Sequence, residues 1–317
     1  MKHNKLLTAI LAVVTIAATS CQKYSDQKPT IAGIAVAGAD FSTLEAAAIK
    51  GGVAIVLSNP NPADPSGHYT VFAPNNAAFA RLGLVDEGSL AALNTTFLTN
   101  TLLYHVSNGD LLGNALTTGS TSKSALGPTR RIIMRGTDKY INGSKILATD
   151  ISASNGTVHV IDKVMIASGD NIVNTAIAAT TSKIFAGPEL TFLVAAVVKS
   201  GLAAALSDPS ANFTIYAPSD AAFMAAGFKT PADVSALPAS TLQAVLLNHA
   251  VAGGKFTSEV SSTTATTAGG GTLTYGAFDN GMFTIKSKGI TTPANMVIPD
   301  IQCTNGIVHI IDKVLLP

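Results

Sequence analysis

Apolar residues follow a helical spacing in two stretches of this chain, residues 41–50 and residues 190–199. In the first stretch Leu44 and Ala48 lie four positions apart, which places both side chains on one face of a helix. The second stretch repeats this spacing. The pattern therefore predicts two amphipathic helices, each with one buried face.

Strand-like patterns follow each of these predicted helices. Residues 69–72 and 213–216 alternate in the manner of strands, and both runs are followed by Ala-Pro. Residues 158–164 and 308–315 are near-continuous apolar runs, which are typical of buried strands. The chain thus mixes helices and strands in the same order twice.

Polar residues mark the expected starts of helices and hairpins. Asn75 and Ser219 each follow Ala-Pro and precede Ala-Ala-Phe, where a helix N-cap is expected. Asn-Gly pairs begin at Asn142, Asn155 and Asn305, and such pairs favour tight hairpin turns. The last third of each half is therefore predicted to be rich in strands and turns.

The order of elements repeats because the sequence itself repeats. Tyr69-Thr-Val-Phe-Ala-Pro-Asn-Asn-Ala-Ala-Phe79 returns 144 residues later as Phe213-Thr-Ile-Tyr-Ala-Pro-Ser-Asp-Ala-Ala-Phe223. Asn155-Gly-Thr-Val-His-Val-Ile-Asp-Lys-Val164 returns 150 residues later as Asn305-Gly-Ile-Val-His-Ile-Ile-Asp-Lys-Val314. A period this long is close to the size of one domain.

The chain is therefore expected to hold two copies of one domain, residues 30–168 and residues 169–317. Each copy is predicted to be an α+β unit, with helices packed against a curved sheet or a small sandwich. Between the repeated blocks, His105 and His249 each lie at the end of a helical pattern.

The N-terminus has the pattern of an export signal. Two lysines are followed by an uncharged apolar run over residues 6–18, and small residues then lead to Cys21. This resembles a bacterial lipoprotein signal, which predicts a signal peptide over residues 1–20, lipid on Cys21 and a polar tether over residues 21–29. An ordinary secretory signal is the alternative. Because Gln22 follows the cysteine, the outer membrane is the expected location, on either its periplasmic or its outer face.

Composition excludes several classes of protein. The net charge is +1 and charged residues make up 12% of the chain, so no basic patch for nucleic acid is expected. If Cys21 carries lipid, Cys303 has no partner for a disulfide and is expected to be a small buried thiol.

The two repeated blocks resemble the signature motifs of the fasciclin domain. Tyr104-His105 matches the tyrosine-histidine element that lies between those motifs, whereas the second copy has Asn248-His249. The resemblance implies a β-sandwich or wedge packed with helices and a role in adhesion at cell surfaces without catalysis. The partner contact assigned to the tyrosine-histidine region in animal members carries over only to Tyr104 and His105.

Four histidines and two aspartates are the remaining candidates for chemistry. A zinc site usually takes about four ligands, and no Cys or Glu cluster accompanies the histidines. Internal hydrogen bonds are therefore the expected role, with a metal site or a partner surface as alternatives. The carboxylates stand in apolar strands, where they need a partner. The residues given this structural role are His105, His159, Asp162, His249, His309 and Asp312.

Two functions follow from these observations. The first is an envelope-anchored adhesion or ligand-binding protein, without catalysis, cofactor or metal. Its expected partners are an unidentified protein or polysaccharide at the cell surface and the membrane that holds its lipid. The alternative is an accessory envelope enzyme or a carbohydrate-handling component, which would need convergent polar groups in a deep pocket.

Overall fold

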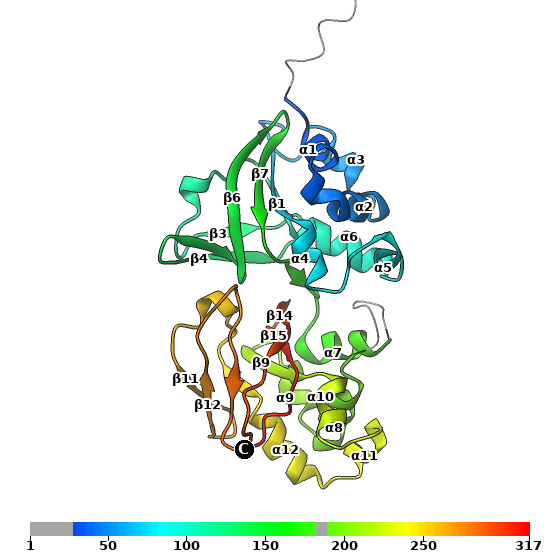
Figure 1. Cartoon of the computed structure of the whole chain (residues 1–317), viewed down its shortest axis with the longest axis vertical. Helices are drawn as coiled ribbons and strands as arrows, with labels where there is room; N and C mark the ends of the chain where they lie inside the picture. The colour runs from blue at the N-terminus through cyan, green and yellow to red at the C-terminus, as the bar shows by residue number, and fades with distance from the viewer. Residues whose placement is uncertain (1–27, 182–188) are drawn as a thin grey trace, which may run out of the picture.

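The computed structural model describes residues 28–181 and 189–317. It contains two domains stacked end to end, and in each domain helices lie on one side and strands on the other (Figure 1). The expected signal peptide and Cys21 lie outside the described residues.

Helices make up one layer of each domain. In the first domain they are α1 (Ile31–Ala37), α2 (Ser42–Lys50), α3 (Ala54–Leu57), α4 (Asn76–Ala80), α5 (Glu87–Ala91) and α6 (Thr95–Tyr104), with short 3₁₀ turns η1 (Ala39–Phe41) and η2 (Gly113–Ala115). In the second domain they are α7 (Ile172–Thr181), α8 (Thr191–Ser200), α9 (Ala203–Ser207), α10 (Asp220–Ala225), α11 (Pro231–Ser235) and α12 (Ala239–Leu247), with η3 (Thr257–Glu259).

Strands make up the other layer. Those of the first repeat are β1 (Tyr69–Pro74), β2 (Val106–Asn108), β3 (Thr121–Lys123), β4 (Thr129–Arg135), β5 (Asp138–Ile141), β6 (Ser144–Ala153), β7 (Gly156–Ile161) and β8 (Ile166–Ala167). Those of the second repeat are β9 (Phe213–Pro218), β10 (Ala250–Ala252), β11 (Thr264–Thr266), β12 (Thr272–Tyr275), β13 (Ile285–Lys286), β14 (Met296–Cys303) and β15 (Gly306–Ile311).

The two repeated sequence motifs lie side by side in each sheet. In the first domain the strand order is β2-β1-β7-β6-β5-β4-β3, and β1 runs parallel to β7 with Val71 opposite Val158. In the second domain β9 and β15 pair in the same way, within a five-stranded sheet beside a separate three-stranded one. The final apolar run of each repeat therefore lies between two neighbouring strands, which explains its continuous hydrophobicity.

Each sheet has a core on both faces. In the first domain one cluster joins the sheet to the helices and includes Phe79 and Leu102. A second cluster fills the opposite face beneath the hairpin strands and includes Phe72 and Ile141. This two-sided packing confirms the predicted α+β wedge.

Local signals of the sequence are confirmed in detail. Asn75 Oδ1 accepts a hydrogen bond from Ala78 N at 2.9 Å, and Ser219 Oγ accepts one from Ala222 N at 3.0 Å, so both residues cap helices. Asn142 and Gly143 form a hairpin turn with φ of 45° and 81°. The predicted helices at residues 41–50 and 190–199 correspond to α2 and α8.

The end of the first repeat completes the sheet of the second. Strand β8 pairs in parallel with β14, with Ile166 opposite Ile301. This exchange places the covalent link between the repeats inside the second domain's core, where Ile166 is buried.

Within residues 28–181 and 189–317, no single helix is long and apolar enough to cross a membrane. The segments Ile31–Ala37 and Ala39–Lys50 meet the length and composition criteria together but are bent by 105°.

Candidate functional site

Asn155 and its counterpart Asn305 connect the hairpin turn of each domain to its helices. Asn155 Oδ1 accepts from Ile31 N at 2.9 Å, and its Nδ2 donates to the carbonyls of Leu57 and Asn59, both at 2.9 Å. Asn305 makes the same three kinds of contact in the second domain. The Asn-Gly pair predicted a turn here, but the side chain's role in joining α1 to α3 became visible only in the folded chain.

The residue after each of these asparagines must be glycine, because the backbone of the neighbouring strand lies too close to leave room for a side chain. Gly156 begins β7 with φ of 144°, and a Cβ added there would lie 1.9 Å from the carbonyl oxygen of Tyr69. The hairpin loop is therefore formed by Ser154 and Asn155, one position before the predicted Asn-Gly turn.

His105 and His249 tie the last helix of each repeat to the chain that follows its final strand. His105 Nδ1 donates to Thr101 O at 2.7 Å, and its Nε2 accepts from Met165 N at 2.9 Å. His249 repeats both bonds with Val245 O and Leu315 N. Both rings are therefore neutral, and each of their nitrogens takes part in a hydrogen bond within the protein.

His159 and His309 have the opposite tautomer. His159 Nε2 donates to Leu111 O at 2.7 Å, and its Nδ1 accepts from Asp150 N at 3.2 Å. His309 bonds in the same way to Lys255 O and Asp300 N. Asp150 and Asp300 both have positive φ, so each histidine stabilises a left-handed backbone position.

Burial disfavours the charged form of all four histidines. It lowers the pKa of His105 and of His249 to about 4, and it also lowers the pKa values of His159 and His309. Among the described residues, no group of three or more His, Cys, Asp and Glu side chains is placed to hold a metal ion.

The two candidate aspartates accept backbone hydrogen bonds in equivalent hairpins. Asp162 Oδ1 accepts from Lys145 N at 2.7 Å, and Asp312 Oδ1 accepts from Asn295 N at 2.7 Å. Burial raises the pKa of Asp162, although its contacts with neighbouring cations and the backbone oppose this effect. Each carboxylate thus links the start of β6 or β14 to the chain just after β7 or β15.

Tyr104 lies at the contact between the domains. Its side chain is buried, and its hydroxyl bonds to Gln302 of the second repeat and to Asn142 of the first. Tyr104 and His105 therefore offer no exposed surface to a second molecule in this structure. In the second copy Asn248 Nδ2 instead donates to Leu315 O within its own domain. The tyrosine thus lies on the surface of the first domain that the second domain covers.

A buried ion pair joins the domains beside this tyrosine. Lys163 Nζ lies 2.6 Å from Asp300 Oδ2, and both side chains are buried. Lys163 Nζ also donates to Gly281 O at 2.9 Å, so the partners of this first-repeat lysine lie in the second repeat. Lys163 belongs to the repeated Ile-Asp-Lys-Val motif, but the motif gave no sign that one lysine would cross to the other domain.

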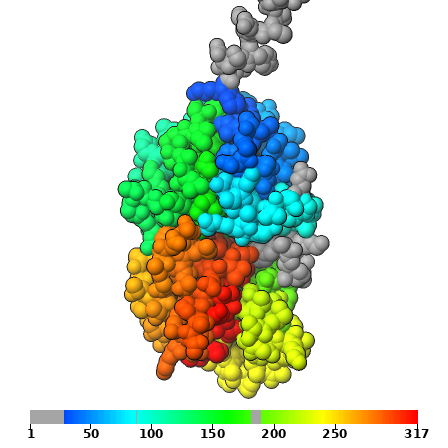
Figure 2. Space-filling view, in the orientation of Figure 1, coloured from blue at the N-terminus to red at the C-terminus, as the bar shows by residue number. Residues whose placement is uncertain are grey.

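Two arginines of β4 extend the contact. Arg131 Nη2 lies 2.9 Å from Glu259 Oε2, and its guanidinium stands over the ring of Phe256. Arg135 Nη1 donates to Val260 O at 2.9 Å, and its guanidinium stands over Phe278. The space-filling view shows the domains packed directly against each other along this boundary (Figure 2).

Cys303 has the structural role expected of it. Its thiol is free and buried, and burial raises its pKa. The Sγ atom lies 3.3 Å from Thr175 Oγ1 in the core of the second domain.

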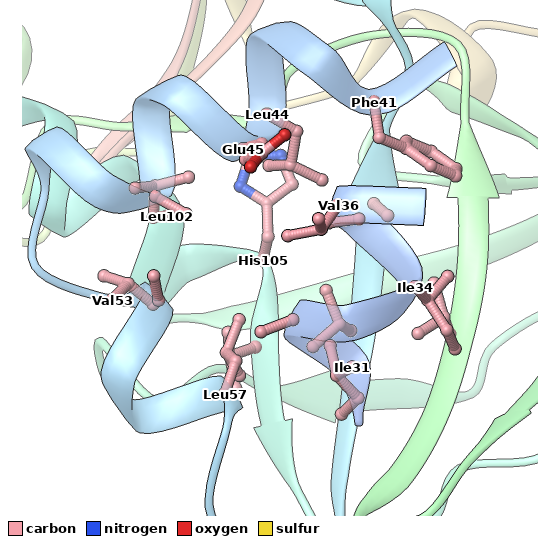
Figure 3. A pocket seen from close by; sticks show the side chains of 18 of the residues that line it. Ile31, Ile34, Val36, Phe41, Leu44, Glu45, Val53, Leu57, Leu102 and His105 are labelled. Atoms are coloured by element: carbon pink, nitrogen blue, oxygen red, sulfur yellow. The ribbon is translucent and has the colours of Figure 1, made fainter. Parts of the chain in front are cut away.

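The first domain contains an apolar pocket of about 150 Å³ between α1, α2, α3 and β1. Leu44, Val36 and Leu57 reach into it from the three helices (Figure 3). Val36 and Ile49 on its rim are each 64% exposed, and Ile55 on the adjacent α3 is 76% exposed. Sequence periodicity assigned α2 a buried face but predicted neither α1 nor α3, so it did not show that the junction of the three helices is left open.

Comparison with known proteins gives two regions that match one family. The family model described as fasciclin domain matches residues 39–167 and 188–317. The chain is similar to the transforming growth factor-beta-induced protein ig-h3 of Sus scrofa, with 30% identity over 79% of this chain and 35% of that protein. It therefore spans about a third of that relative's length.

A bacterial relative and a solved structure are also similar. Cell surface glycolipoprotein MPB83 of Mycobacterium bovis is 30% identical over 46% of this chain and 69% of its own length. The FAS1 domain pair of the insect cell adhesion molecule fasciclin I has 17% identity and a TM-score of 0.40, over 79% of this chain and 89% of that one. The family match covers most of the chain, in the order and at the positions of its internal repeat. The chain belongs to the fasciclin domain family, with two copies of the domain.

Proposed function

We propose that this protein is a surface-anchored, non-catalytic binding module in which the domain pair acts as one rigid unit. The observation that carries the proposal is a contrast on the first domain. Its histidines have both nitrogens occupied by internal bonds, whereas large apolar side chains on α1, α2 and α3 are exposed. Exposed apolar surface of this kind is typical of sites that bind another molecule.

Rigidity follows from the contacts between the domains. A buried ion pair, a tyrosine hydrogen bond and a shared strand all join the two repeats. Relative motion would expose the ion pair to water and would break the hydrogen bond between Tyr104 and Gln302. The pair therefore presents its two outer surfaces at a fixed separation, which suits binding between surfaces.

The N-terminal anchor gives this unit an orientation. The bacterial relative MPB83 is named a cell surface glycolipoprotein, which supports lipid attachment at Cys21. Helix α1 lies at the end of the molecule that is remote from the second domain (Figure 1). An anchor before Lys28 would hold the first domain close to the outer membrane and the second domain farther away.

An enzymatic role would need convergent polar groups in a pocket. The first domain's pocket is lined by three polar side chains, Glu45, Ser58 and His105, and the other lining residues are apolar. Both ring nitrogens of His105 are already bonded within the domain. No observation therefore favours the accessory enzyme over the binding module.

The proposal is tested by adhesion with and without display. Beads that carry the chain from residue 22 onward should adhere to envelope or matrix extracts, while the same soluble chain binds weakly, because multivalency can raise avidity by roughly 10²–10⁴. Equal binding in both formats would contradict adhesion by display. In cells, Cys21→Ala should move the protein from the membrane fraction to the soluble fraction, and unchanged fractionation would contradict the anchor.

A further inference from the structure

Apolar pockets occupy equivalent places in the two domains. One lies among α1, α2, α3 and β1, and the other lies among α7, α8, α9 and β9, with volumes of about 150 Å³ and 90 Å³. Equivalent residues line both pockets, so the pocket belongs to the fold of the domain and is not confined to one copy. The clearest equivalent pairs are Leu44 with Leu193, Ala35 with Ala176 and Leu57 with Leu206.

The lining of the first pocket selects an occupant without polar groups along its length. Ser58 Oγ donates to Ala54 O at 2.8 Å, and the nitrogens of His105 are both occupied. A peptide segment inserted here would leave its N–H and C=O groups without partners, at a considerable cost in free energy. An aliphatic chain has no such groups, and apolar cavities of about 150 Å³ take up small apolar molecules.

One charged side chain distinguishes the first pocket from the second. Glu45 lines it, whereas the equivalent position in the second pocket is Val194. Among the residues that the structure describes, Glu45 makes no ion pair and no hydrogen bond. A carboxylate without a partner at the pocket attracts an ammonium group and repels a second carboxylate.

The pocket also lies at the end of the domain where the chain leads to Cys21. Helix α1 begins at Ile31, and Ile31 itself lines the pocket. The ten residues from Cys21 to Ile31 reach at most about 35 Å when fully extended. A lipid surface that holds Cys21 is therefore within reach of the pocket.

We propose that the pocket of the first domain binds one aliphatic chain of a membrane lipid with an amine-bearing headgroup. The part of the chain next to the headgroup fills the space between the three helices, and the ammonium group lies beside Glu45. The inference rests on the proposed function only for the nearness of the membrane. Binding by the pocket itself requires no anchor.

Titration calorimetry of the chain from residue 22 onward tests this directly, because all described residues are retained. The probes are hexylamine, octylamine, decylamine and decanoate, each below its micelle concentration. Affinity should rise roughly fourfold per added methylene until the pocket is full. Decanoate should bind about tenfold more weakly than decylamine. No heat of binding from any amine, or an affinity that does not depend on chain length, would overturn the proposal.

Matched variants in the two pockets test which of them binds the amine. Ala35→Phe fills the first pocket and should weaken decylamine binding by about tenfold or more. Ala176→Phe makes the same change in the second pocket and should leave the tighter binding event unchanged. Glu45→Gln leaves the apolar lining intact and should remove the preference for decylamine over decanoate, which keeps the test valid even if Ala35→Phe fails to fold. Equal effects of the two phenylalanine variants would overturn the assignment to the first domain.

Sedimentation distinguishes a second copy of the chain from a lipid. If the wild type forms a dimer that Ala35→Phe abolishes and decylamine does not displace, the pocket holds a protein partner and the proposal is wrong. Ala35→Phe should not alter the dependence of membrane fractionation on Cys21. A failure of the lipid site is therefore distinguishable from a failure of the anchoring proposal.

Discussion

Lys163 Nζ lies 2.6 Å from Asp300 Oδ2 across the boundary between the two domains, and both side chains are buried. The equivalent lysine of the second repeat, Lys313, is partly exposed and lies 4.0 Å from Asp312. One motif thus serves two purposes. Its first copy joins the domains, and the lysine of its second copy lies beside the neighbouring Asp312 of its own repeat.

Removing one member of this pair should be costly. Lys163→Met leaves Asp300 as a buried charge without its cation, and we expect the free energy of unfolding to fall by about 3–5 kcal/mol. Denaturant unfolding measures this change. The matched control Lys313→Met removes a partly exposed lysine and should change stability by less than about 0.5 kcal/mol.

A second variant shows whether the loss of stability comes from the ion pair or from general disruption of the interface. Asp300→Asn combined with Lys163→Met removes both charges, and the double variant should be more stable than Lys163→Met alone. If the two effects simply add, the lysine and the aspartate are not coupled, and the ion pair does not hold the domains together.

Tyr104→Phe should weaken the same interface through hydrogen bonds. It removes the hydroxyl that bonds to Gln302 and Asn142, and a buried group left without its partner costs about 1–3 kcal/mol. Tyr140→Phe is a matched control, because Tyr140 packs on Phe278 across the interface through its ring. Equal stability losses in the two variants would show that the Tyr104 hydroxyl has no special role.

Gly143 allows the close approach of the two domains. A Cβ at this position would lie 2.1 Å from Asp300 Oδ2, and the residue has φ of +81°. Gly136 also has positive φ, at +63°, but nothing lies within 4 Å of its Cβ direction. Gly136→Ala should therefore cost only about 1–3 kcal/mol for its backbone strain, and Gly143→Ala should cost more. Indistinguishable losses of stability would mean that Asp300 moves aside freely.

Acid should destabilise the protein through its buried histidines. The folded pKa of His105 and of His249 is about 4, below the unfolded value of 6.5. Between these values the unfolded chain binds more protons, so the free energy of unfolding falls as the pH falls from 6.5 to about 4. This contribution is fully present above pH 6.5 and is on the order of 3 kcal/mol for each of the two histidines.

Denaturant unfolding at several pH values between 7 and 4 measures this dependence. His249→Gln should reduce the slope of stability against pH in this window. An unchanged slope in His249→Gln would contradict a neutral histidine in the folded state.

The sequence allowed the fold to be predicted because its strongest signals are local and occur twice. Helices α2 and α8 follow from apolar spacing, and the caps Asn75 and Ser219 follow from short polar residues before Ala-Ala-Phe. Helix α1 was not predicted, since its seven residues are too few for a clear periodicity and its N-terminus is fixed by the distant Asn155.

Contacts between the repeats could not be predicted from either repeat alone. Tyr104 bonds to Gln302 of the other domain whereas Asn248 bonds within its own domain, and nothing in the local pattern shows which surface will be covered. Strand β8 is two residues long and pairs with β14 of the other repeat, which a run this short does not reveal. The apolar pocket was missed for a similar reason, because periodicity identifies a buried face but not a gap between helices.

If the two fasciclin domains form one rigid unit, they should unfold together, and differential scanning calorimetry of the chain from residue 22 onward measures whether they do. We expect a single transition whose calorimetric and van't Hoff enthalpies agree, and we expect Lys163→Met to split it into two. Two separate transitions in the wild type, both unchanged by Lys163→Met, would contradict it.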